Sequence, residues 1–98
     1  PSARIRERVI QARHTAQERF ARHGWSCNAQ ASGSWLRDHT SRAALQVIDR
    51  ALNRERLSLR GADRSMRLAW TLADLSGANS PTPDHMFTAI GLRTEDRP

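Results

Sequence analysis

Apolar residues recur along most of the chain at intervals of three and four positions, the spacing of one face of an α-helix. The pattern is strongest between Leu57 and Gly77, where Ser58 is the expected N-cap and Gly77 the expected C-terminal stop. Two adjacent apolar rows follow this helix: Ala62, Met66, Ala69 and Ala73, and beside them Leu68, Leu72 and Leu75. Two rows form a wide buried arc, so we expect this helix at the centre of a small bundle.

Three other segments share this period and are expected to be the remaining main helices: Ser2 to about Arg22, Ser41 to about Asn53, and Pro83 to about Leu92. Thr82 is the expected N-cap of the last one, because proline is favoured at the first position of a helix. The side chains expected in the core lie on the apolar faces of these helices: Ile5, Val9, Ala12, Ala16 and Phe20; Ala44, Val47, Ile48, Ala51 and Leu52; Met86, Phe87, Ala89 and Ile90.

The connecting segments are rich in residues that favour turns. Residues 24–34 end the first helix, and Trp25 is expected to pack back against the core. Residues 93–98 are expected to be a frayed tail. No segment alternates with period two, and no internal repeat is present. The sequence therefore predicts an all-α fold: one domain over residues 1–98, a small bundle of four main helices to which Ser34 to His39 would add a short fifth.

The composition excludes several classes of protein. No apolar run approaches the length of a membrane span, and the single Cys27 cannot form an internal disulfide, so we expect a cytoplasmic location. The net charge is +6, which permits a polyanionic partner.

All 16 basic residues are arginine, and because a Walker A motif requires lysine, the chain is not expected to be an enzyme by itself. The start at Pro1 fits both removal of an initiator methionine and a segment of a longer protein.

Few residues have the spacing of a catalytic or metal site. The four histidines and Cys27 are scattered, so no metal site is expected, and Ser26 and Cys27 lack the neighbours of a nucleophilic triad. Glu18 is expected to pair with Arg22, whereas Asp74 has no partner in the sequence. The tryptophans are expected to be core anchors, although base stacking is the alternative: Trp25, Trp35 and Trp70.

The polar stripe of the central helix carries arginines one turn apart in its first half: Arg60, Arg64 and Arg67. A helix N-terminus is already positive, so Arg60 and Arg64 each destabilise this helix by about 0.3–1 kcal/mol. An anion bound at this end would reverse that effect. The alternative is a solvated face, because arginine is about one residue in six of this chain and Asp63 can pair with Arg67.

The central segment LSLRGADRSMRLAWTLADL resembles a motif of the C-terminal lid domain of magnesium-chelatase-related AAA+ ATPases of the ComM/YifB type, L-S-x-R-A-x-x-R-x-L-R-V-A-R-T-I-A-D-L. The matching positions are Leu57, Ser58, Arg60, Arg64, Arg67, Ala69, Thr71, Ala73, Asp74 and Leu75. Weaker matches follow in the same order: Arg8-Val9, Ala12-Arg13, Asn28-Ala29, His85, Ala89-Ile90 and Arg93. The chain departs from the pattern at Gly61, at Trp70, where the family has arginine, and at Gly91-Leu92.

The resemblance implies a helical lid that follows a P-loop domain in a longer protein and assembles with copies of itself in a ring, most simply a hexamer. The longer protein would bind ATP and Mg²⁺, while this domain alone would bind no cofactor. Arg60 occupies the position of the sensor-2 arginine, which contacts the γ-phosphate during hydrolysis. Arg64 and Arg67 would line the nucleotide cleft or the subunit boundary. The resemblance also implies a DNA-related role in branch migration and natural transformation.

A stand-alone basic DNA-binding module is the alternative function, because a charge of +6 on a small helical domain permits it. The two hypotheses differ in their requirements. A lid needs an upstream P-loop domain, whereas a DNA-binding module needs only duplex DNA.

Overall fold

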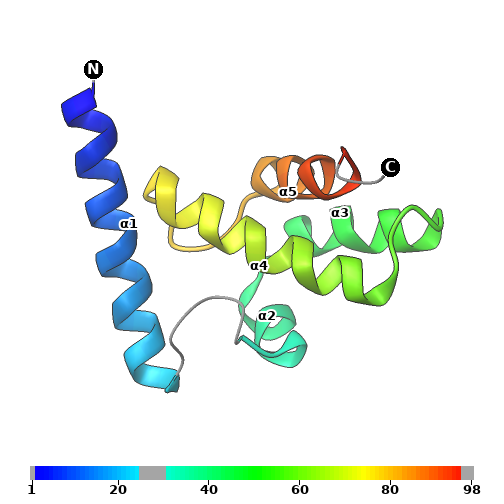
Figure 1. The fold of residues 1–98 in the computed structure, drawn as a ribbon. Helices are drawn as coiled ribbons and strands as arrows, with labels where there is room; N and C mark the ends of the chain where they lie inside the picture. Colours follow the sequence, from blue (N-terminus) through cyan, green and yellow to red (C-terminus); the bar gives the residue numbers. More distant parts are fainter. Residues whose placement is uncertain (1, 25–30, 96–98) are drawn as a thin grey trace.

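The computed structural model describes residues 2–24 and 31–95, of which 20 and 93–95 are described by their backbone alone. Five helices follow one another along the chain (Figure 1): α1 (Ser2–His23), α2 (Gly33–His39), α3 (Arg42–Asn53), α4 (Leu59–Ser76) and α5 (Pro83–Glu95). The described residues contain no strand, so the predicted all-α fold is confirmed, and α2 is the short fifth helix. The last helix runs three residues beyond the expected Leu92.

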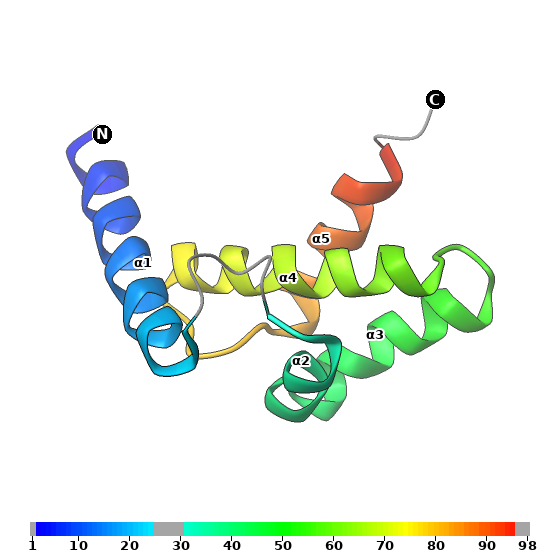
Figure 2. The same cartoon turned by 60° about the horizontal axis from the view of Figure 1, so that its bottom comes forward.

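The central position predicted for α4 is confirmed, since α1, α2, α3 and α5 all pack against it (Figure 2). Its caps are also as predicted. Ser58 Oγ accepts a hydrogen bond from the Gly61 N–H at 3.0 Å, and Gly77 adopts a left-handed conformation with φ 79°. The Ala78 N–H then donates to the Ala73 carbonyl oxygen at 2.9 Å, which closes a Schellman motif. Both ends of α4 are therefore fixed by residues adjacent to them in the sequence.

The core lies between α4 and the helices α2, α3 and α5. Its largest fully buried hydrophobic side chains are Leu36, Ile48, Met66 and Met86. Fully or almost fully buried alanines allow the helices to approach closely: Ala44, Ala62, Ala69, Ala73 and Ala89. The first predicted row of α4 is thus confirmed as core, and Leu68 and Leu72 of the second row are half-buried against it.

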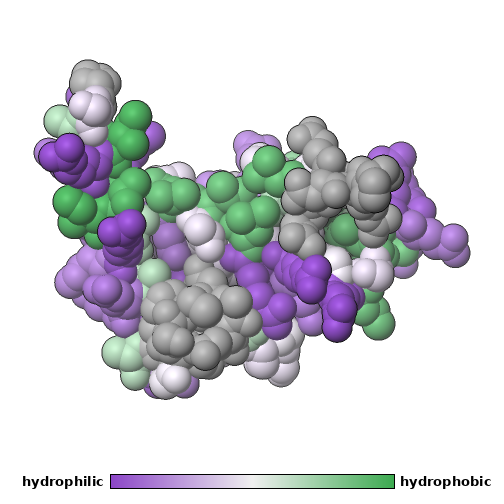
Figure 3. All heavy atoms as spheres, viewed as in Figure 1, coloured by the Kyte–Doolittle hydropathy of each residue, from purple (hydrophilic) through white to green (hydrophobic). Residues whose placement is uncertain are grey.

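Three residues expected in the core are exposed instead: Ile5 by 62%, Phe87 by 66% and Leu75 by 39%. The N-terminal half of α1 extends past α4, so no described helix covers Ile5 (Figure 1). Hydrophobic residues are visible on this half of α1 in Figure 3. Each of these side chains lies on an apolar face by spacing, but the neighbouring helix does not reach it.

The expected ion pairs on the helix surfaces are not those that form. Glu18 pairs with His14, whose Nε2 lies 2.8 Å from the carboxylate, and not with Arg22. Among the described residues, Asp63 and Arg67 make no ion pair. The Asp63 carboxylate lies instead beside the start of α2, so close to Gly33 that a Cβ there would lie 3.2 Å from Oδ2. The expected pair of Asp63 and Arg67 does not form because each side chain contacts the segment at the start of α2 instead.

Some expectations fall on residues outside the described part of the chain, namely Trp25, Ser26, Cys27 and the tail beyond Glu95. The side chain of Phe20 is likewise outside it. Within the described ranges, every helix is too short or too polar to cross a membrane.

Candidate functional site

The fold separates the three arginines of the central stripe. Arg60 and Arg64, in the first two turns of α4, are exposed, and in the part of the chain that the structure describes neither guanidinium makes an ion pair. Arg67 is half-buried, and its Nε donates a hydrogen bond to the carbonyl oxygen of Ala31 at 3.0 Å. Arg67 therefore holds the segment that leads into α2. Among the described residues, the two arginines nearer the helix start make no such hydrogen bond.

The N-terminus of α4 presents positive charge without a compensating acid. Its first turn contains no acidic residue, and the Ser58 side chain satisfies only the N–H of Gly61. The N–H groups of the first residues of an α-helix have no intrahelical acceptor, so they add partial positive charge beside Arg60. Leu59 next to it is 76% exposed. An anion, or an anion-bearing protein surface, would find both charge and apolar area here.

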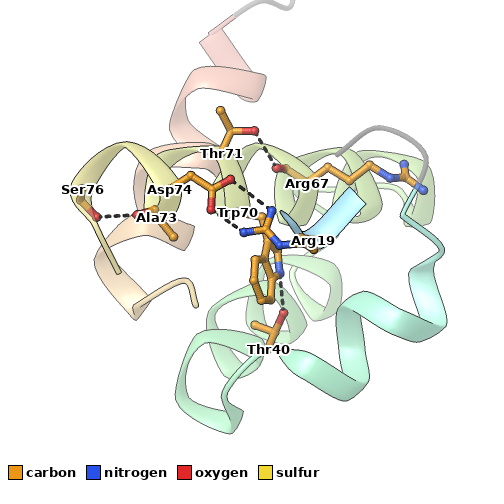
Figure 4. Close-up of polar contacts among 8 residues, drawn as sticks. All are labelled: Arg19, Thr40, Arg67, Trp70, Thr71, Ala73, Asp74 and Ser76. Carbon is orange, nitrogen blue, oxygen red and sulfur yellow. Dashed lines mark hydrogen bonds and ion pairs between the residues drawn. The ribbon is translucent and has the colours of Figure 1, made fainter. Parts of the chain in front are cut away.

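A buried ion pair joins α1 to α4 (Figure 4). Both terminal guanidinium nitrogens of Arg19 donate to the Asp74 carboxylate, with Nη1 3.1 Å from Oδ2, and both residues are only 5% exposed. The Arg19 guanidinium also lies over the Trp70 ring, 4.8 Å from its centroid. The Trp70 indole N–H in turn donates to Thr40 Oγ1 at 3.1 Å. This cluster of Arg19, Asp74, Trp70 and Thr40 therefore connects α1, α4 and the C-cap of α2.

Sequence reasoning missed this cluster because it placed Asp74 on a polar stripe without a partner. A signal was present: Asp74 follows Trp70 by four residues, so the two share a face of α4. Arg19 likewise follows Ala12 and Ala16 on the side of α1 that faces α4. A charged residue on the buried face of a helix indicates a buried ion pair. The sequence did not show which residue pairs with Asp74, because Arg19 lies 55 residues away.

A cavity of about 440 Å³ borders this cluster. Aromatic rings form part of its wall: the Trp35 and His39 rings stack with centroids 4.3 Å apart, and the Trp35 and Trp70 rings are 5.0 Å apart. The predicted anchoring role is confirmed for Trp70, which is 5% exposed, and Trp35 packs against the same core. Arg19 also lines the cavity, and its charge is neutralised by the ion pair with Asp74.

The described residues offer little else for a cofactor or for covalent chemistry. Nowhere among them do three His, Cys, Asp or Glu side chains come together as metal ligands would. Of the three arginines in the central stripe, the two exposed ones at the start of α4 are the candidates for ligand contact.

Comparison with known proteins gives a family match across almost the whole chain. The family described as magnesium chelatase, subunit ChlI C-terminal, matches residues 1–93. This chain belongs to that family. Within it, two curated relatives are 43% identical over 94 residues, the uncharacterized proteins Rv2897c of Mycobacterium tuberculosis and Mb2921c of Mycobacterium bovis. The aligned region covers 94% of this chain but only 19% of each relative, and no solved structure matches the chain.

The motif residues of this magnesium chelatase C-terminal domain fall into a buried group and an exposed group. Ala69, Ala73 and Asp74 are buried and hold the bundle together. Arg60 and Arg64 belong to the same motif, but the described fold gives neither an ion pair. At position 70, where the motif has arginine, the tryptophan lies under a guanidinium that comes from α1. The Arg19 guanidinium from α1 therefore places a positive charge beside position 70, where the motif has an arginine side chain.

Proposed function

We propose that this chain is the helical lid of a magnesium-chelatase-like AAA+ ATPase of the ComM/YifB type, with Arg60 as its sensor-2 arginine. Family membership supports the lid assignment. One observation carries the role of Arg60: its exposed guanidinium stands at the positive end of the central helix, where the first turn contains no acid. That arrangement destabilises the isolated helix and favours a bound anion.

In this proposal a P-loop domain in the longer protein binds ATP and Mg²⁺. Negative charge on the transferred phosphoryl group must be stabilised in the transition state, and a positioned guanidinium does so in a water-poor cleft. Arg60 would supply that charge. Arg64, one turn further along the same face, would line the cleft or the boundary with a neighbouring subunit. Arg67 would act indirectly, since its hydrogen bond to Ala31 already fixes the segment before α2.

The proposal extends to the assembly of the longer protein. Its subunits would form a ring, a hexamer by resemblance, and the lid would transmit the nucleotide state to ring movement. The work done by that movement would be DNA-related.

The test is Arg60→Ala in the longer protein. Loss of a transition-state charge contact is expected to lower ATP turnover by about 10²-fold or more, with ring assembly unchanged. The matched control is Arg42→Ala, because Arg42 is also an exposed arginine at the first turn of a helix, α3. Steady-state hydrolysis and size-exclusion chromatography measure the two effects. Turnover equal to that of the Arg42→Ala protein would refute the role of Arg60.

The alternative function, a stand-alone DNA-binding module, is tested with the 98-residue chain itself. It requires duplex DNA binding that weakens steeply as salt rises, because each phosphate contact releases counterions. Fluorescence anisotropy between low and moderate salt measures this. No binding to duplex DNA at low salt would exclude the module.

A further inference from the structure

A small pocket between α3 and α5 combines apolar and basic residues, none of which belongs to the proposed nucleotide contact. Its volume is about 170 Å³. Half-buried side chains of both helices line it, together with Phe87, which is 66% exposed. Three exposed arginines complete the lining: Arg50, Arg54 and Arg56. The pocket therefore offers a small apolar surface and three guanidinium groups to a ligand.

Local backbone structure places the arginines around the pocket. Arg50 follows Val47 by three residues on one face of α3, and Arg54 is the C-cap residue just after that helix. Arg56 comes after Glu55, whose φ of 57° turns the chain back at the end of α3. The Arg56 N–H donates to the Ala51 carbonyl oxygen at 3.0 Å, so the third arginine is held beside the same face.

The basic charge at this pocket is not neutralised within the described residues. Among the residues whose side chains the structure describes, none that lines the pocket is acidic, and none of the three arginines makes an ion pair. Asp49, the acid on α3, pairs with Arg37 at 3.3 Å. The helix dipole favours cations at the C-terminal end of α3, which accounts for Arg50 in the last turn and for Arg54 at the C-cap. It does not account for Arg56, nor for a large aromatic side chain left in solvent.

We propose that this pocket docks an acidic segment of another polypeptide, which inserts one large apolar side chain between α3 and α5. The guanidinium forks would pair with carboxylates on either side of that anchor. A second copy of this chain is a poor occupant, because it carries 16 basic and 10 acidic residues and its acids are dispersed. Nucleic acid would satisfy the arginines through phosphates, but the polar edges of its bases would lack hydrogen-bond partners in the apolar lining.

The test uses the 98-residue chain and three fluorescein-labelled probes. The first is a short peptide with one phenylalanine flanked by glutamates, the second has alanine in place of the phenylalanine, and the third is oligo-dT. We expect the phenylalanine peptide to bind about 10-fold more tightly than the alanine peptide, because one large apolar side chain is removed from water. Anisotropy titrations measure the affinities.

Variants assign the binding to the pocket. Arg54→Glu and Phe87→Ser are each expected to weaken the phenylalanine peptide about 10-fold, and both positions are exposed, so the fold should persist by circular dichroism. Arg42→Glu makes the same charge change at the other end of α3 and should leave the affinity within about twofold. Arg60→Ala should also leave it unchanged, which separates this proposal from the nucleotide contact.

Three results would overturn the docking proposal. One is the absence of measurable peptide binding, and another is an equal loss in Arg42→Glu, which would show a general effect of charge. The third is oligo-dT binding that is tighter than peptide binding and is lost in Arg54→Glu, which would assign the pocket to nucleic acid.

Discussion

The Arg19–Asp74 pair shows how one charged residue on α1 can be buried without an unpaired charge. Both residues are 5% exposed, the carboxylate accepts from two guanidinium nitrogens, and the Trp70 ring covers the cation. Removing two charges from water is costly, so such a pair adds little stability over an apolar pair. Removing one partner is different, because the remaining charge stays buried and uncompensated.

We therefore expect Asp74→Ala to lower the free energy of unfolding by about 3–5 kcal/mol. The double variant Arg19→Met with Asp74→Leu should lose much less, since neither side chain is charged. Urea denaturation followed by circular dichroism compares the two proteins with the wild type. If Asp74→Ala proves as stable as the double variant, the pair is not buried as the structure has it.

At the scale of elements, a hydrogen-bonded link joins the end of α4 to the start of α5. Thr82 Oγ1 accepts from the His85 N–H at 3.2 Å, and His85 Nδ1 accepts from the Thr82 N–H at 3.0 Å. The pair forms a capping box in which histidine replaces the usual Glu or Gln. Because Nδ1 accepts, the proton lies on Nε2, 2.9 Å from Ser76 Oγ, which in turn donates to the Ala73 carbonyl.

His85→Ala is expected to destabilise the protein by about 1 kcal/mol, because the Thr82 N–H loses its acceptor and the link to Ser76 is broken. His85→Glu should recover part of that loss, since a glutamate at this position restores the capping box and complements the helix dipole. Thermal unfolding of the three proteins measures the difference. A glutamate variant no more stable than the alanine variant would exclude the capping role.

At the scale of the whole molecule, α1 packs against α4 along only part of its length. The radius of gyration is 13.6 Å, somewhat above the roughly 13 Å of a compact domain of this size. The reason is visible in Figure 1, where the first half of α1 extends beyond α4. Ile5 of the apolar stripe is 62% exposed, so the described residues cover only part of that stripe, and Ile10 outside the stripe is 59% exposed.

The sequence alone determined the helices, their order and the caps of α4 and α5. Helical period and caps depend on residues within about four positions of one another, so Ser58, Gly77 and Thr82 could be assigned without knowledge of any neighbour. The motif in α4 likewise directed attention to Arg60, although the role of that arginine stays a prediction.

Only the tertiary structure decided which faces are covered and which charges meet. Apolar spacing marked Phe87 for burial, but no described helix covers it, and it lines a basic pocket instead. Asp74 lacked a partner in the sequence because its partner is 55 residues away on α1. Arg67 lies on the predicted polar stripe but is half-buried, because its side chain donates a hydrogen bond to the Ala31 carbonyl oxygen. Such contacts depend on how helices pack, and a local pattern gives which face is apolar but not which helix will cover it.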